Sequence, residues 1–271
     1  MFHRRTTGSV VCPSCGSLVG VRDDKCYSCG RANPGMWGFA PLLRQLGGDF
    51  GFVPLVIGSC ATLYALMLLV PGMTLNGGGM NFLVPSDDAI KVFGASGAMP
   101  VFFYGRWWTL LTASWLHASF LHILFNMMWV RDLGPVMAEI VGPARTAIIY
   151  TVAGVCGFLL SSAIGTPYTL GASASVFGLL GALVHYGRKS GSSLIRGQAM
   201  NYAVILFIMG FLIRGVDNFA HAGGFAGGYA MSAFFNPLTR ERGDHMLIAF
   251  ICLIATFASI VFSVLHGFQI L

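Results

Sequence analysis

Seven apolar stretches that are almost free of charge follow one another along this chain of 271 residues. The first, from about 52 to 70, has no charged side chain and is long enough to cross about 30 Å of hydrocarbon as a helix. Only 10% of the residues are charged, against about a quarter in a soluble domain. This pattern predicts an all-α, polytopic membrane bundle of seven transmembrane helices. The later stretches lie near 107–129, 145–164, 171–187, 199–213, 218–235 and 246–267.

The basic residues lie in short clusters between the apolar stretches rather than in one patch, so the net charge of +6 does not indicate nucleic-acid binding. The N-terminal segment and every second loop after it hold thirteen Lys and Arg residues, and the alternate loops hold three. This asymmetry predicts a cytoplasmic N-terminus and, with seven spans, a C-terminus on the outside. The expected location is a bacterial inner membrane.

Four of the seven cysteines form two C-x-x-C pairs in a polar N-terminal segment, namely Cys12, Cys15, Cys26 and Cys29. Two such pairs place four thiolates within tetrahedral reach of one ion. A reducing cytoplasm disfavours disulfides, so we expect a small zinc ribbon with structural zinc; two redox pairs or unbound thiols are the alternative. So small a segment has no core of its own, and the metal would supply most of its folding energy. The ribbon could bind a cytosolic partner or only anchor the N-terminus.

Polar side chains interrupt three of the apolar stretches, and polar groups within a membrane usually mark function. His122 and Asn126 are four residues apart and therefore project from one face of one helix. Ser173 starts a helix after the loop 165–170, and His221 opens another helix from the same side. With the predicted topology, all three sites lie in the outer half of the bilayer.

This grouping of polar residues favours nucleophilic catalysis. Ser173 lies near a helix N-terminus, where the helix dipole stabilises a developing oxyanion. His221 can accept the serine proton, and the two polar side chains of the earlier helix can donate hydrogen bonds to the oxyanion. Gly224 and Gly228 are spaced to let their helix pack closely against its neighbour. Each feature alone has a structural explanation, such as a serine bonding its own helix, but together they favour a reactive site.

Three motifs resemble those of the rhomboid intramembrane serine proteases in order and spacing. They are H-x-x-x-N at 122–126, G-x-S at 171–173 and A-H-x-x-G-x-x-x-G at 220–228. The likeness covers about residues 50–235. It implies a six-helix core with a Ser-His dyad, without a catalytic Asp and without a catalytic cofactor.

The resemblance also implies individual roles. The backbone N–H of Ser173 would join His122 and Asn126 in stabilising the oxyanion, and Phe177 occupies the position of the ring that packs on the catalytic His. The loop 71–106 looks like the membrane-embedded first loop of the family. The last span resembles the single helix that some members add after the core.

The chain is accordingly expected to fall into four parts. Residues 1–35 are the cytoplasmic zinc-ribbon-like module, and 36–51 are a linker. Residues 52–236 are the rhomboid protease core. Residues 237–271 are a cytoplasmic loop and the additional C-terminal transmembrane helix.

The sequence departs from the family pattern at two places. The family usually reads G-x-S-G, but Ala174 follows the serine here, and its methyl group could crowd the substrate carbonyl or be harmless. The usual Trp-Arg pair appears as Trp108 with Arg106 nearby. Ser96 lies in a better match to G-x-S-G, but no apolar helix directly follows it and it precedes the H-x-x-x-N motif, so we do not expect it to be the nucleophile.

These features together predict an intramembrane serine endopeptidase that cleaves transmembrane segments of single-pass membrane proteins. The lipid bilayer is the other expected partner, and nucleic acid is not one. A catalytically silent rhomboid-like protein that binds membrane clients is the alternative, although such relatives typically lose the Ser or the His. A transporter is disfavoured because the spans hold no paired carboxylates.

Overall fold

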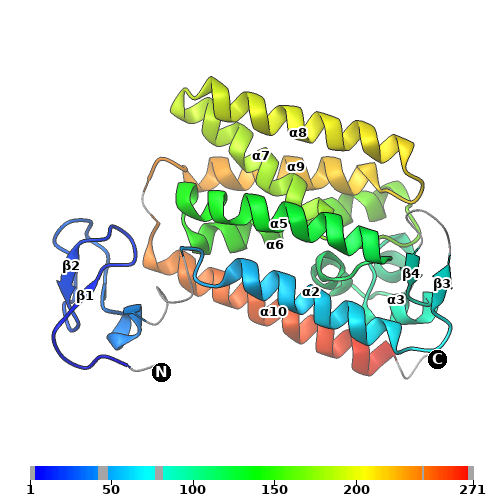
Figure 1. Ribbon diagram of the computed structural model, residues 1–271, viewed down its shortest axis with the longest axis horizontal. Coiled ribbons are helices and arrows are strands. Elements are labelled where there is room, and N and C mark those ends of the chain that lie inside the picture. Colours follow the sequence, from blue (N-terminus) through cyan, green and yellow to red (C-terminus); the bar gives the residue numbers. More distant parts are fainter. Residues whose placement is uncertain (1–3, 42–47, 77–81, 240, 268–271) are drawn as a thin grey trace.

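The computed structural model describes residues 4–41, 48–76, 82–239 and 241–267, and Figure 1 shows their arrangement. Within these residues, the long helices form one bundle and run side by side, with the N-terminal module at one end. The long helices are α2 (Phe52–Leu68), α5 (Phe120–Val141), α6 (Pro143–Ile164), α7 (Ser173–Ser190), α8 (Ser193–Leu212), α9 (Asn218–Phe235) and α10 (Gly243–Gly267). They correspond in number and order to the seven predicted spans, so the predicted helical bundle is confirmed.

The long helices differ in whether their length and apolar composition alone would let them cross a membrane. Among the described helices, α6, α8 and α10 are long and apolar enough to cross a membrane, and α2 is apolar but shorter. The most apolar part of α6 is mostly buried within the protein, whereas α8 and α10 are mostly exposed. The remaining helices α5, α7 and α9 carry the polar motifs. The polar residues are therefore grouped on helices whose composition alone does not mark them as spans.

The second span begins later than predicted. The sequence placed it near 107–129, but α5 starts at Phe120, where the Ser119 hydroxyl caps the helix by accepting from the backbone N–H of His122 at 3.2 Å. Before it, Thr109–Thr112 (α4) and Ala113–Trp115 (η3) are short turns of helix. Trp115 is 1% exposed. The apolar residues before α5 are thus buried against protein rather than spanning the bilayer.

The described residues between α2 and α5 form several short elements. Strand β3 (Thr74–Asn76) pairs antiparallel with β4 (Phe82–Val84), and α3 (Asp87–Phe93) follows. A single π-helical turn, η2 (Met99–Phe103), then leads to α4. We call residues 82–119 the connecting segment. In Figure 1, its strand β4 and α3 lie near the C-terminal end of α10.

Close packing of α9 on α7 brings two helix backbones together. A Cβ atom on Gly224 would lie 2.1 Å from the carbonyl oxygen of Ala174, and one on Gly228 would lie 2.0 Å from that of Gly178. Any side chain larger than hydrogen would push the helices apart. The two glycines therefore set the distance between the helices that begin with Ser173 and His221.

The N-terminal module is a small hairpin. Contrary to the expectation that it has no core, six residues form a small buried cluster that includes Val10, Val19 and Cys12. Strands β1 (Ser9–Val11) and β2 (Leu18–Gly20) pair antiparallel, with Val10 opposite Val19. A 3-10 turn, η1 (Met36–Gly38), follows. The module meets the bundle where the Arg31 guanidinium contacts the sulfur of Met246 on α10 at 2.8 Å.

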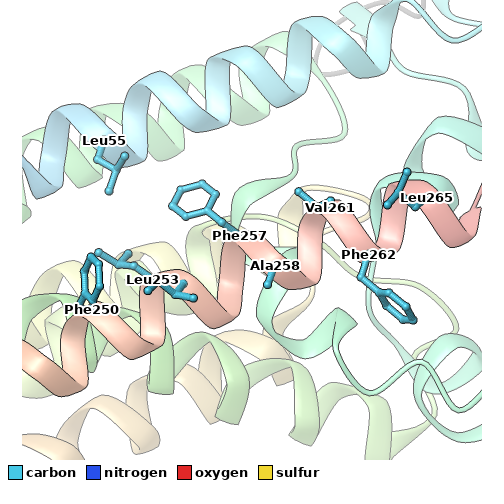
Figure 2. A pocket seen from close by; sticks show the side chains of 9 residues that line it. Leu55, Phe250, Leu253, Phe257, Ala258, Val261, Phe262 and Leu265 are labelled. Carbon is cyan, nitrogen blue, oxygen red and sulfur yellow. The ribbon is translucent and has the colours of Figure 1, made fainter.

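An apolar groove runs between α2 and the exposed face of α10 (Figure 2). Leu55 lines it from α2, and Leu253 and Phe257 are among the residues that line it from α10. Charged side chains are absent from this lining among the described residues. In a membrane such a surface is compatible with lipid chains.

Candidate active site

Ser173 is the first residue of α7 and follows the loop of residues 165–172, which we call the α6–α7 loop. Its side chain is half-buried. Gly171, two residues earlier, has a φ of 129°, a conformation that a glycine adopts without strain. This turn brings the chain into α7 so that Ser173 lies at the positive end of the helix dipole.

The Ser173 hydroxyl meets the imidazole of His221. The Oγ of Ser173 and the Nε2 of His221 are 3.0 Å apart, which is hydrogen-bond distance. His221 lies in the first turn of α9 and is 5% exposed. The two residues are 48 positions apart in the chain, and the close packing of α7 on α9 brings them together.

Asn218 determines which nitrogen of His221 carries the proton. Its side-chain NH₂ donates to the carbonyl of Phe207 on α8 at 3.2 Å, which turns the amide oxygen toward His221 Nδ1 at 3.1 Å. Because an amide oxygen only accepts, the hydrogen-bond network assigns the proton to Nδ1 and leaves Nε2 free to accept from Ser173. Asn218 is not among the site residues predicted from the sequence.

Phe177 fixes the plane of the imidazole. Its ring stacks on that of His221, with centroids 4.2 Å apart and an angle of 12° between the planes. Phe177 lies one turn after Ser173 on α7, so the same helix carries the serine and the ring on which the imidazole packs.

His122 lies close to Gly171, near Ser173. Its Nδ1 accepts from the backbone N–H of Ala118 at 3.3 Å, which leaves the proton on Nε2. A Cβ added to Gly171 would lie 2.7 Å from that Nε2 and 3.7 Å from the Ser173 Oγ. His122 therefore presents an N–H donor near the Ser173 hydroxyl.

Asn126 follows His122 by one turn of α5 and is 5% exposed. Its side-chain NH₂ donates to the carbonyl of His122 at 2.9 Å. This bond occupies one of its two N–H groups, and the other stays available as a donor. His117 packs its ring edge-on against His122, with centroids 5.2 Å apart.

Two other polar residues near the site have structural partners. Asp217 caps α9, because its carboxylate accepts from the backbone N–H groups of Phe219 and Ala220 at 3.1 and 3.0 Å. Ser96 is fully buried and pairs with Thr169 in a short antiparallel bridge. Neither side chain is hydrogen-bonded to the dyad among the described contacts.

Ala174 lies between helices rather than beside the reacting groups. It is fully buried, and its methyl carbon would lie 2.8 Å from a Cβ on Gly157 of α6. It belongs to an apolar cluster that includes Phe158 and Ala220. The methyl group thus fills the packing between α6, α7 and α9.

The four N-terminal thiols converge on one point. The sulfur atoms of Cys12, Cys15, Cys26 and Cys29 all lie within 4.8 Å of one another. The sulfur atoms of Cys12 and Cys29 are 3.7 Å apart and those of Cys15 and Cys26 are 3.5 Å apart. Both distances are close to the edge of about 3.8 Å that a tetrahedron with Zn–S bonds of about 2.3 Å requires. The four thiols therefore fit a zinc ion.

The protonation of these thiols differs. Burial raises the pKa of Cys12 to about 12. At Cys15, desolvation also acts to raise the pKa, but hydrogen bonds from Ser17 and from neighbouring thiols outweigh it and lower the pKa to about 6. One thiolate is thus favoured before metal binding, and a bound cation would favour deprotonation of the others.

Comparison with known proteins agrees with this geometry. The family model for the Rhomboid domain matches residues 104–238, which include the dyad. "Rhomboid protease GluP" of Bacillus subtilis is 32% identical over 200 residues, which cover 72% of this chain and 38% of that protein. "RHOMBOID-like protein 7" of Arabidopsis thaliana is 34% identical over 160 residues, which cover 55% of this chain and 49% of that protein.

A third relative, "Rhomboid-like protease 3" of Toxoplasma gondii, is 29% identical over 160 residues, which cover 56% of this chain and 60% of that protein. The chain thus spans less than two thirds of the length of each of these relatives. The matched domain, the apolar helices and these relatives lead to one conclusion: the chain is an integral membrane protein that belongs to the rhomboid family.

Proposed function

We propose that this protein is an intramembrane serine endopeptidase that cleaves transmembrane segments of other membrane proteins. The observation that carries the proposal is the Ser173–His221 contact at 3.0 Å, with the imidazole held in the tautomer that accepts a proton at Nε2. Two relatives whose names include "protease" support it.

The geometry supports a two-step acyl transfer. The Ser173 oxygen attacks the peptide carbonyl carbon while His221 Nε2 takes the hydroxyl proton. The resulting imidazolium keeps its Nδ1–H bonded to Asn218. It then protonates the leaving amine, and the peptide bond breaks to give an acyl-enzyme. A water molecule, deprotonated by the same nitrogen, releases the acyl group and restores the serine. The dyad needs no cofactor for this chemistry.

Three donors are proposed to stabilise the oxyanion. They are His122 Nε2, the free side-chain N–H of Asn126, and the backbone N–H of Ser173 at the start of α7. Losing one such donor in a water-soluble enzyme costs about 10²–10³ in rate. Because three groups share the load here, a single substitution should cost less.

The substrate is proposed to be a single-pass membrane helix with small residues at the cut and Gly or Pro nearby. In lipid, a helix keeps its backbone hydrogen bonds because water cannot replace them. A peptide bond can reach Ser173 only where the helix unwinds, and Gly and Pro lower that barrier.

The orientation is proposed from the charge asymmetry. Thirteen Lys and Arg against three place the N-terminus in the cytoplasm and the C-terminus outside. A bacterial inner membrane remains the predicted location, although the relatives come from Arabidopsis and Toxoplasma as well as Bacillus.

The chain is proposed to consist of parts with different roles. Residues 52–236 form the protease core, and 237–271 add a loop and a helix. Residues 1–35 form a cytoplasmic zinc ribbon, joined by the linker 36–51, that holds structural zinc and offers a surface to a cytosolic partner. The thiol cluster supports the metal assignment.

The decisive experiment is labelling with a fluorophosphonate probe, combined with cleavage of a generic single-helix substrate in liposomes. Ser173→Ala and His221→Ala should each abolish both signals, and the double variant should be no worse because the two residues act as one unit. Ser175→Ala is the matched control, since its hydroxyl bonds Ser114 at 3.1 Å instead of the base. Labelling of Ser173 would exclude a silent client-binding protein, and full cleavage by pure Ser173→Ala would refute the mechanism.

A further inference from the structure

The C-terminal end of α10 is bound to the connecting segment by polar contacts. The hydroxyl of Ser263, which is fully buried, accepts from Arg106 Nη2 at 3.1 Å and from Trp108 Nε1 at 3.3 Å. The Trp108 ring also packs edge-on against Phe262, with centroids 4.7 Å apart. Buried hydroxyls on a membrane helix are costly unless paired, and Ser263 is paired only with this segment among the described contacts.

The same serine lies against the turn that starts the G-x-S-G sequence. A Cβ on Gly94 would lie 2.4 Å from the Ser263 Oγ and 2.6 Å from the Thr112 Oγ1. Thr112 in turn donates to the carbonyl of Gly94. This turn is therefore held between α10 and α4.

The connecting segment then holds the α6–α7 loop. Ser96 and Thr169 exchange two backbone hydrogen bonds, of 2.9 and 2.7 Å. The N–H of Ala98 donates to the Thr166 carbonyl at 2.7 Å. A Cβ on Gly97 would lie 2.4 Å from the Pro167 carbonyl oxygen, so only glycine allows this approach.

Two further backbone bonds complete this attachment. The N–H of Met99 donates to the Pro167 carbonyl at 3.2 Å, and that of Gly171 donates to the Ala113 carbonyl at 2.9 Å. The second bond lies two residues before Ser173. The connecting segment thus holds the backbone of the α6–α7 loop as far as Gly171, two residues before Ser173.

We propose that α10 positions the nucleophile, with Ser263 as the positioning residue: through Arg106 and Trp108 it fixes the connecting segment, which fixes the α6–α7 loop and therefore Ser173. This inference rests on the proposed function. The helix α10 lies after the matched domain, which ends at residue 238. Under this proposal α10 contributes to catalysis without contacting the substrate. The proposal also explains the G-x-S-G sequence at Ser96 as a docking strand for the α6–α7 loop.

The test compares Ser263→Ala with Ser259→Ala in the full chain reconstituted in liposomes. Ser259 lies one turn earlier on α10, and its hydroxyl makes no hydrogen bond within the described residues. Backbone hydrogen exchange in residues 165–172 and steady-state cleavage are measured for both. Trp108→Phe is a second, conservative variant, because it removes the Nε1–H donor and keeps a ring beside Phe262.

For Ser263→Ala we expect about tenfold faster exchange in the α6–α7 loop, with exchange in α7 and α9 unchanged. The kcat should fall about 10- to 100-fold, as for a misplaced reacting group, with KM within about twofold. Trp108→Phe should also speed exchange in the α6–α7 loop and lower kcat. Equal exchange and equal kcat in Ser263→Ala and Ser259→Ala would overturn the positioning. A wild-type protein that neither cleaves nor labels would overturn the proposed function, and the exchange comparison would then decide the positioning alone.

Discussion

Replacing Gly224 by alanine should separate Ser173 from His221, the proposed catalytic pair, without removing either residue. The new methyl would lie 2.1 Å from the Ala174 carbonyl oxygen, whereas ordinary contact begins at 3.4 Å, so the helices must part by 3.4 − 2.1 = 1.3 Å. The neighbouring atom is backbone and cannot rotate away. Because His221 lies one turn before Gly224 on α9, it moves with that helix.

A shift of this size breaks the hydrogen bond of the dyad. The 3.0 Å separation of Ser173 and His221 would grow to about 4 Å, beyond the usual limit of about 3.2 Å. A misplacement of about 1 Å costs about 10²-fold in rate, which corresponds to about 2.7 kcal/mol of activation free energy. We therefore expect Gly224→Ala to cleave and to label about 100-fold more slowly.

The assay is the initial rate of cleavage and of fluorophosphonate labelling, each normalised to folded protein by circular dichroism. Gly58→Ala on α2 is the matched control, because a Cβ there meets nothing within 4 Å. It should keep wild-type rates. Wild-type rates in a folded Gly224→Ala variant would refute the argument that the contact between α7 and α9 sets the dyad distance.

Three other substitutions test separate parts of the site and the ribbon, and Asp217→Asn is a control. Asn218→Ala should lower kcat about fivefold, because a net hydrogen bond is worth about 1 kcal/mol and His221 loses the partner that selects its tautomer; unchanged kcat would contradict this. Asp217→Asn should keep activity, since asparagine caps a helix as well as aspartate does. Ala174→Gly should destabilise the protein by about 1 kcal/mol in thermal unfolding without raising activity; faster cleavage would mean that the methyl crowds the substrate. Cys12→Ser should abolish a zinc content of about one per chain, measured by mass spectrometry, while proteolysis survives.

The number and order of the helices could be predicted because each long apolar stretch ends near charges or glycines. The start of the second span could not. The residues from Trp107 to Trp115 are as apolar as a span, but most of those from Leu110 onward fill the protein interior, and Trp115 is almost fully buried. Lipid and protein interior are equally apolar, so composition does not distinguish them.

The candidate site could be predicted where its residues lie on one helix or at a similar depth in the membrane. Ser173 and His221 were paired from their places at helix starts on one side of the bundle. The role of Asn218 was not predictable, because its amide orientation depends on the carbonyl of Phe207 on another helix. Likewise the attachment of α10 depends on Ser263, which in the sequence is one small residue in an apolar stretch.

The contact between α10 and the connecting segment has a consequence for the order of biogenesis. A ribosome synthesises α10 after every other described helix, so Arg106 and Trp108 have no Ser263 to bond until the rest of the bundle has been inserted. The catalytic pair is encoded earlier and can assemble before that moment. If the α10 contacts position Ser173 as proposed, the nascent chain stays less active while its own helices are still unpacked and open to cleavage. Insertion of α10 would then also report that the preceding described helices are in place.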